Sequence, residues 1–164
     1  MSTAAPLRLV LDTNVWLDWM LFDDDAVTPL KQAQSAGRIA ICIDEACARE
    51  LEAVLQYDLG KRTPTAEQRE AARVEYARIA KRTTANDTTA STAPLPRCSD
   101  RDDQKFLELA RDCGADYLVT KDKALLVLAR RKTRPAPCRI VTPSEMGAIF
   151  ENAGGLVEGL PAVY

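Results

Sequence analysis

The sequence predicts an α/β fold: a single domain with a central, mostly parallel, twisted sheet and helices on both of its faces. Short apolar runs alternate with longer segments whose apolar residues recur every three or four positions. Two of the apolar runs are followed by a polar corner with an aspartate, Asp12 and Asp122. The length of 164 residues suits one domain with a buried core. Together these observations favour an open sheet whose ligand-binding edge is acidic.

The first half of the chain supplies two strands and their helices. Thr13 and Asn14 suit a strand-to-helix corner, Gly37 suits a helix end, and Asp44 suits a helix cap. The acidic run 23–25 is typical of a solvated loop that caps the next helix. The expected elements are a strand at Leu7–Leu11, a helix at Thr13–Leu21, a helix at Thr28–Ala36, a strand at Arg38–Ile43 and a helix at Glu45–Leu59.

The second half continues the alternation. Ser99 or Asp100 can cap a helix that Gly114 ends, and Thr142 with Glu145 resembles a capping box. The expected elements are a largely solvated helix at Lys61–Arg82, a loop at Thr83–Pro96, a helix to Ala110, a strand at Ala115–Thr120, a helix at Ala124–Ala129, a strand at Arg139–Val141 and a short helix at Met146–Phe150. We therefore expect an N-terminal tail at 1–6, the domain at 7–150 and a C-terminal tail at 151–164.

The composition excludes several kinds of chemistry. The chain has no histidine, so histidine-based triads, imidazole zinc ligands and histidine general bases are excluded. The five cysteines form no CxxC pair, which indicates reduced, packing residues rather than a disulfide scaffold or a thiolate zinc site. A net charge of −2 argues against nonspecific nucleic-acid binding over the whole surface. Carboxylates, lysines, hydroxyls or a hard metal must do any chemistry.

Nothing in the sequence indicates a membrane. No apolar run approaches the roughly 18 residues that a spanning helix needs. The first residues show no basic segment followed by a long apolar one, as a secretory signal would. We expect a cytoplasmic protein that has no membrane partner.

Carboxylates gather at one edge of the predicted sheet. Asp12 and Asp122 follow strands, while Asp102 and Asp103 fall in the first turn of a helix. Helix capping alone explains one or two first-turn acids, but positions 100–103 hold three. Crowded carboxylates repel one another, and a divalent cation removes that repulsion. Because the available donors are oxygens, Mg²⁺ or Mn²⁺ is favoured over zinc.

Four segments resemble the PIN-domain nucleases, and in particular the toxin components of bacterial toxin–antitoxin pairs. They are the strand that ends in Asp12-Thr13-Asn14, the helix with Arg49-Glu50-Leu51, the segment Asp102-Asp103-Gln104-Lys105-Phe106-Leu107, and Tyr117-Leu118-Val119-Thr120-Lys121-Asp122. The resemblance covers roughly Leu7 to Phe150. No single motif is specific, and the order and context of the acids carry the match.

The resemblance implies that four acids hold one or two Mg²⁺ or Mn²⁺ ions for phosphodiester hydrolysis. By position these catalytic and metal-binding residues are Asp12, Glu50, Asp103 and Asp122. The helical pattern alone favours an exposed acid at Glu50, and the family's spacing prefers Asp103 to Asp102. Supporting roles are expected for Thr13, Asn14, Asp100 and Asp102, and substrate-binding roles for Lys121 and Lys123, although a plain cap or a surface lysine explains these as well.

The implied function is a metal-dependent endoribonuclease, the toxin of a toxin–antitoxin pair, acting on single-stranded or structured RNA. The implied partners are RNA, a cognate antitoxin and a second copy of the chain. Two alternatives stay open: a non-catalytic or weakly catalytic PIN fold that binds an antitoxin, and a metal-dependent DNA nuclease. A haloacid-dehalogenase phosphatase is disfavoured, because Asn14 stands where that class has a second acid.

Overall fold

Strands and helices alternate along the chain as expected. The computed structural model describes residues 5–83 and 94–157. Much of the expected loop at 83–96, and parts of both expected tails, lie outside the described residues. The strands are β1 (Leu7–Leu11), β2 (Ile39–Ile43), β3 (Ala80–Arg82), β4 (Tyr117–Val119) and β5 (Arg139–Val141). The helices are α1 (Thr13–Met20), α2 (Thr28–Ser35), α3 (Glu45–Leu55), α4 (Ala66–Ile79), α5 (Gln104–Cys113), α6 (Lys123–Leu126) and α7 (Pro143–Val157).

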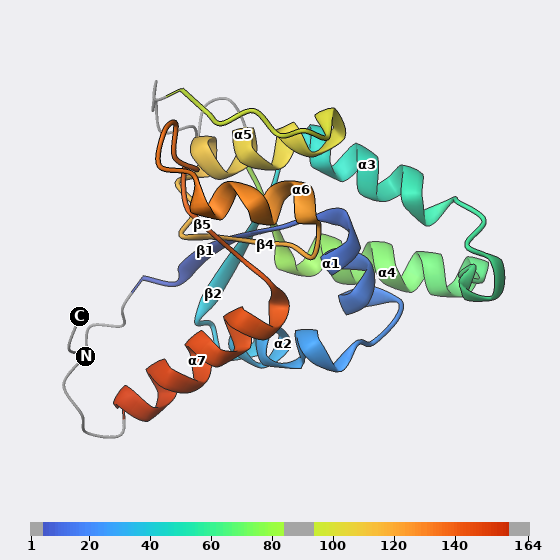
Figure 1. The fold of residues 1–164 in the computed structure, drawn as a ribbon. Coiled ribbons are helices and arrows are strands. Elements are labelled where there is room, and N and C mark those ends of the chain that lie inside the picture. Colours follow the sequence, from blue (N-terminus) through green and yellow to red (C-terminus); the bar gives the residue numbers. More distant parts are fainter. Residues whose placement is uncertain (1–4, 84–93, 158–164) are drawn as a thin grey trace.

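Within the described residues the strands form one sheet in the order β3-β2-β1-β4-β5, and every neighbouring pair is parallel. This confirms the predicted α/β class. β2 and the second half of β1, Leu9–Leu11, consist of buried apolar side chains, as inner parallel strands require. α5 packs on β1, β2 and β4, whereas α2 and α7 pack together on the other side of the sheet (Figure 1).

The chain reverses its direction of travel across the sheet at β1. It first moves outward from β1 to β2 and β3, and it then returns to β4 on the other side of β1 (Figure 1). Leu11 pairs with Val119, so β1 and β4 end at the same level. The segments that leave these two strands diverge, and such a switch point opens a crevice at the carboxyl edge of a sheet.

The structure corrects two expectations and extends a third. The segment expected as one helix at Lys61–Arg82 divides into a 3₁₀ turn at Gly60–Arg62, α4, and the edge strand β3. β3 escapes sequence reasoning because Ala80-Lys81-Arg82 is short and has no alternating apolar pattern. The expected helix at Ala124–Ala129 is α6 followed by a 3₁₀ turn. The last helix continues to Val157, into the segment expected as a tail.

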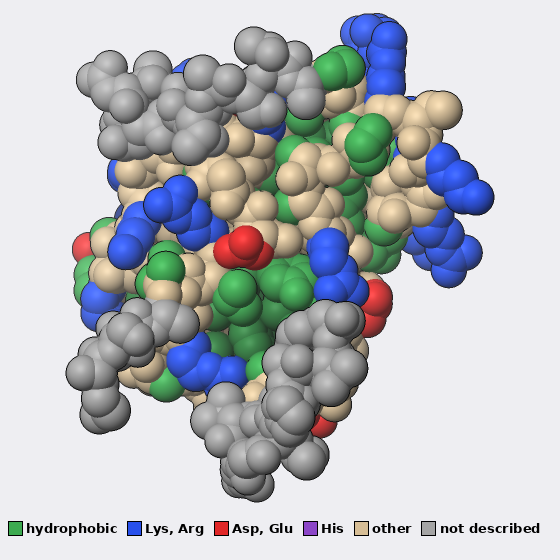
Figure 2. Space-filling model, turned by 90° about the vertical axis from the view of Figure 1, so that its left-hand side faces the viewer, with side chains coloured by type: hydrophobic (Ala, Val, Ile, Leu, Met, Phe, Trp, Pro, Cys, Tyr) green, Lys and Arg blue, Asp and Glu red, His purple; other side chains and the backbone are tan. Residues whose placement is uncertain are grey.

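The left-hand side of Figure 1, where the amino ends of the strands lie, carries few acidic side chains. Figure 2 shows this face, with hydrophobic side chains in its middle and lysines and arginines around them. In the parts of the chain that the structure describes, no helix is both long and apolar enough to cross a membrane. The predicted acidic residues lie at the opposite, carboxyl edge.

Shortening a buried side chain and shortening an exposed one should have different effects on the free energy of unfolding. Leu30 on α2 is fully buried, whereas Val74 on α4 is 60% exposed. We expect Leu30→Ala to lower the free energy of unfolding by about 2–5 kcal/mol, because it leaves a cavity. Val74→Ala should change it by less than about 0.5 kcal/mol. Urea unfolding followed by tryptophan fluorescence measures both, and equal effects would contradict the described packing.

Candidate metal centre at the carboxyl edge of the sheet

A cleft of about 250 Å³ opens at the switch point between β1 and β4. The four acids expected as catalytic residues and their four expected supporting residues all contribute to its wall, although they come from four distant parts of the sequence. The lining residues are Asp12, Thr13, Asn14, Glu50, Val54, Asp100, Asp102, Asp103, Phe106 and Asp122. The fold therefore gathers the predicted acids in one place.

Asp12 is fixed by the end of its own strand and the start of the next helix. Its Oδ1 accepts a hydrogen bond from the backbone N–H of Val15 at 2.9 Å, so Asp12 caps α1 itself, in place of Thr13 or Asn14. Its Oδ2 accepts the hydroxyl of Thr120. Burial raises the pKa of Asp12, and the hydrogen bond from Thr120 opposes that shift.

Asp122 has the corresponding capping role three residues after β4. Its Oδ1 accepts the backbone N–H of Ala124 at 2.9 Å and caps α6. Its own N–H donates to the hydroxyl oxygen of Thr120 at 2.9 Å. Thr120 is fully buried and thus links the two strand-end aspartates through one hydroxyl group.

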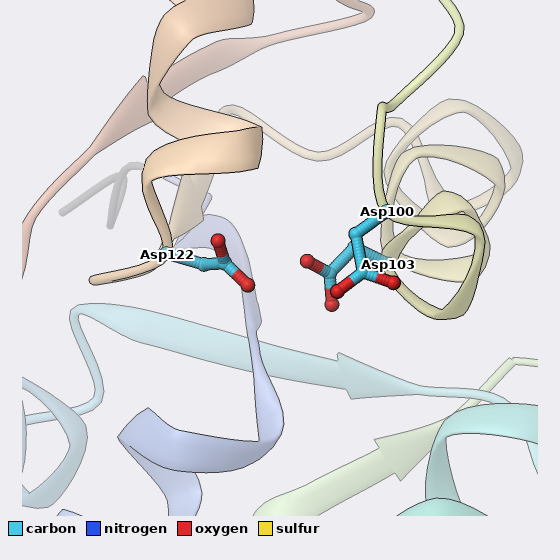
Figure 3. Close-up of side chains that lie close together, drawn as sticks. All are labelled: Asp100, Asp103 and Asp122. Carbon is cyan, nitrogen blue, oxygen red and sulfur yellow. The ribbon is translucent and has the colours of Figure 1, made fainter.

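The third group of acids enters from the start of α5. Asp100 caps the 3₁₀ turn Arg101–Asp103, because its Oδ1 accepts the backbone N–H of Asp102 at 3.0 Å. Asp103 is the last residue of that turn and caps no N–H with its side chain. Figure 3 shows Asp100 and Asp103 on one side of the cleft and Asp122 facing them from the other. One carboxylate oxygen from each lies within 4.8 Å of the other two.

The chemistry of this cluster fits a hard divalent cation. Among the described residues, Asp103 Oδ2 is the buried side-chain polar atom that has no hydrogen-bond partner. Buried polar atoms nearly always have one, so this oxygen calls for a ligand. A donor set made only of carboxylate oxygens would suit Mg²⁺ or Mn²⁺, which prefer oxygen ligands. The residues that would hold the ion here are Asp100, Asp103 and Asp122.

The cluster also holds a proton that an isolated aspartate would release. Burial, and then the hydrogen bond with Asp122, raise the pKa of Asp103 to about 8. The same hydrogen bond lowers the pKa of Asp122. In the absence of a cation the pair therefore favours binding one proton below about pH 8, because two adjacent carboxylates cannot both be charged without cost.

Glu50 lies on α3 at the other side of the same cleft. Its Oε2 accepts the hydroxyl of Thr13, and its Oε1 accepts the ammonium of Lys105 at 2.7 Å. Both oxygens are thus occupied by donors from β1–α1 and from α5. Glu50 is half-buried, so the exposed acid that the helical pattern alone favoured is not what the structure shows.

The remaining expected residues lie at the rim. Asn14 and Asp102 are exposed members of the cleft wall. Lys121 is half-exposed and forms an ion pair with the buried carboxylate of Asp18 on α1. Lys123 is exposed at the start of α6 and is not part of the cleft wall. The two lysines expected to bind substrate therefore flank Asp122 without entering the cleft.

Sequence reasoning missed three residues that hold the site together: Thr120, Lys105 and Asp18. The sequence predicts Thr120 only as the end of a strand, and it indicates no role for Lys105 or Asp18. Their partners lie 108, 55 and roughly 100 positions away, so no local pattern could indicate the contacts. A buried strand that ends in a hydroxyl residue before an acid was the available sign for Thr120.

A larger hollow, about 540 Å³, lies over β1, β2 and β3 and suits a cation poorly. Arg8, Lys81 and Arg82 contribute to its wall, and none of its lining residues is acidic. Cys42 and Cys113 also line it, and the thiol of Cys113 lowers the pKa of Cys42 to about 7. All five cysteines are free, and four of them are buried, as the packing interpretation expected. Because the acids line the smaller cleft, that cleft is the candidate metal site.

Comparisons with known proteins agree with this architecture. A family model described as PIN domain matches residues 8–124, which include all four expected catalytic acids. No curated protein matches the chain. The chain is similar to the crystal structure of VapBC2 from Rickettsia felis bound to a DNA fragment from their promoter. The TM-score is 0.53 at 14% sequence identity, over 83% of this chain and 98% of that one, so this similarity concerns the fold.

The shared proton predicts an unusual pH dependence of the metal-free protein. The pKa of Asp103 is about 8 in the folded chain and near 3.8 in an unfolded one, so between these pH values the folded state binds more protons. Stability should therefore fall as pH rises from about 4 to about 8. Urea unfolding in EDTA at pH 5 and pH 8 measures the loss.

Asp103→Asn should remove most of this loss, because an amide does not titrate. Glu108→Gln, an exposed change on the same helix, should keep it. A wild-type chain whose stability increases from pH 5 to pH 8 would contradict the shared proton.

Proposed function

The chain belongs to the PIN-domain family, and from this premise we propose that it is a Mg²⁺- or Mn²⁺-dependent endoribonuclease and the toxin of a toxin–antitoxin pair. The observation that carries the proposal is the buried, partnerless oxygen of Asp103 beside Asp100 and Asp122. Such an oxygen could bind a cation, and a cation held by carboxylates in an open cleft suits phosphodiester hydrolysis.

The proposed division of labour follows from the contacts. Asp12, Glu50, Asp103 and Asp122 are the proposed catalytic and metal-binding acids. Asp100, which belongs to the close carboxylate cluster with Asp103 and Asp122, is proposed as a further ligand from the 3₁₀ turn. A bound divalent cation supplies an activated water and neutralises the charge that develops on the transferred phosphate. Thr120 orients the carboxylate of Asp12, and Thr13 orients that of Glu50. Histidine is not required for any of these roles.

The surroundings of the cleft are compatible with a nucleic-acid strand. Lys121 and Lys123 flank Asp122, and both are exposed enough to contact phosphates beside the scissile bond. Phe106 and Val54 provide apolar wall beside the acids. We propose that the lysines align the sugar–phosphate backbone while the acids position the cation.

The toxin role rests on the motif resemblance, and the fold similarity to VapBC2 agrees with it. We propose an antitoxin partner and a homodimer on the same basis. Light scattering should give a mass near twice the chain's 18.0 kDa. Co-expression with the product of a small neighbouring reading frame should yield a stable complex. A clean monomer would exclude the homodimer.

The decisive measurement is cleavage of a labelled single-stranded RNA in Mn²⁺. Asp12→Asn keeps an oxygen for the helix cap but removes the charge, so we expect at least a ~100-fold loss of rate with the fold retained. Asp103→Asn should behave in the same way. Glu108→Gln, an exposed change on α5, should leave the rate within about twofold.

Two other outcomes would favour the alternatives. An equal or faster reaction on single-stranded DNA of the same sequence would favour a DNA nuclease. Folded wild-type protein that binds an antitoxin but cleaves neither substrate would favour the non-catalytic binding partner. Cleavage that persists in EDTA, or in Asp12→Asn, would contradict the proposed mechanism.

A further inference from the structure

A lysine forms an ion pair with one of the acids that line the cleft. Lys105, on the first turn of α5, places its ammonium 2.7 Å from Glu50 Oε1. The same ammonium donates to the backbone carbonyl of Asp102. The Lys105 side chain is 21% exposed and that of Glu50 is 27% exposed, so both charges are largely withdrawn from water. An ion pair at this depth is screened less than one on the surface.

The two sides of the cleft differ in how their charge is balanced. On the Glu50 side, Lys105 and the hydroxyl of Thr13 occupy both carboxylate oxygens. On the other side, no lysine or arginine of the described residues forms an ion pair with Asp100, Asp103 or Asp122. Asp103 keeps an oxygen without any partner there. Within the part of the chain that the structure describes, a lysine ammonium therefore balances the acid on the Glu50 side of the cleft but none of the acids on the other side.

We propose that Lys105 competes internally with the divalent cation for Glu50, and that it thereby weakens metal binding by the cleft. This inference rests on the proposed metal-dependent function. The ammonium holds the oxygen that Glu50 would offer to a metal ion. The ion must displace Lys105 before Glu50 can become a ligand. Lys105 therefore lowers the affinity of the cleft for the divalent cation by occupying Glu50.

Isothermal titration with MnCl₂ at pH 7.5 tests this on the full chain. Lys105→Gln keeps the length and polarity of the side chain but removes its charge, so Mn²⁺ should bind at least ~tenfold more tightly. Lys105→Arg keeps the charge and should stay within about threefold of wild type. Arg101→Gln removes an equal charge from an exposed position next to the acids, and it should also stay within about threefold.

A double-mutant cycle tests whether Glu50 mediates the effect. In a Glu50→Gln background the ammonium has no carboxylate to occupy, so Lys105→Gln should change Mn²⁺ affinity by less than about twofold. A change as large as in wild type would show general charge repulsion and would overturn the inference. Thermal unfolding in EDTA verifies that each variant is folded, and Lys105→Met replaces Lys105→Gln if the latter is not.

The outcomes separate the inference from the function on which it rests. If wild type binds Mn²⁺ and Lys105→Gln binds it no more tightly, the inference is wrong while the proposed nuclease stands. If neither protein binds Mn²⁺, both fail. Tighter binding in Lys105→Gln that is lost in the Glu50→Gln background, with Lys105→Arg near wild type, supports the inference.

Discussion

Electrostatic repulsion among carboxylates is the constraint around which the carboxyl edge of the sheet is built. The fold brings Asp12, Asp103 and Asp122 together at the point where β1 and β4 diverge. Their burial removes the water that would screen them, which raises the pKa values of Asp12 and Asp103. The free-energy cost of this repulsion is lowered by backbone N–H groups, by the hydroxyl of Thr120 and by a proton bound between Asp103 and Asp122. The negative charge that remains is what a divalent cation would neutralise.

Hydrogen bonds that hold the site also organise the fold. Asp12 and Asp122 each end a strand-to-helix corner by capping the helix that follows, and Asp100 does the same for the turn before α5. Because the partners are backbone N–H groups, the direction of each carboxylate depends on the backbone, and that of Asp12 depends also on the hydroxyl of Thr120. The positions of the acids are therefore as rigid as the helices that they cap.

The parts of the fold that could be predicted are those that local patterns encode. Buried strands such as β1 and β2 are near-continuous apolar runs, and their helices repeat with the expected period. The edge strand β3 could not be predicted, because its pairing with β2 and not its composition makes it a strand. The sheet order is likewise a property of the assembled chain.

Asp12, Asp103 and Asp122 could be indicated from sequence because they follow strands or begin helices, which are local features. Glu50, in the middle of α3, is indicated only by the family resemblance. The residues that orient or neutralise these acids could not be indicated. Thr120 and Lys105 act on partners in other segments, and nothing around either residue distinguishes it from an ordinary strand end or helix surface. Sequence reasoning thus found the charges of the cleft and missed the groups that balance them.

The double use of Asp12, Asp100 and Asp122 as caps has an evolutionary consequence. An asparagine at any of these positions still offers an oxygen to the waiting N–H group, so the fold survives while a negative charge disappears. A single-base change from acid to amide would therefore remove a negative charge from the cleft while the fold persists. Descendants of such a gene would keep the PIN fold around a less acidic cleft.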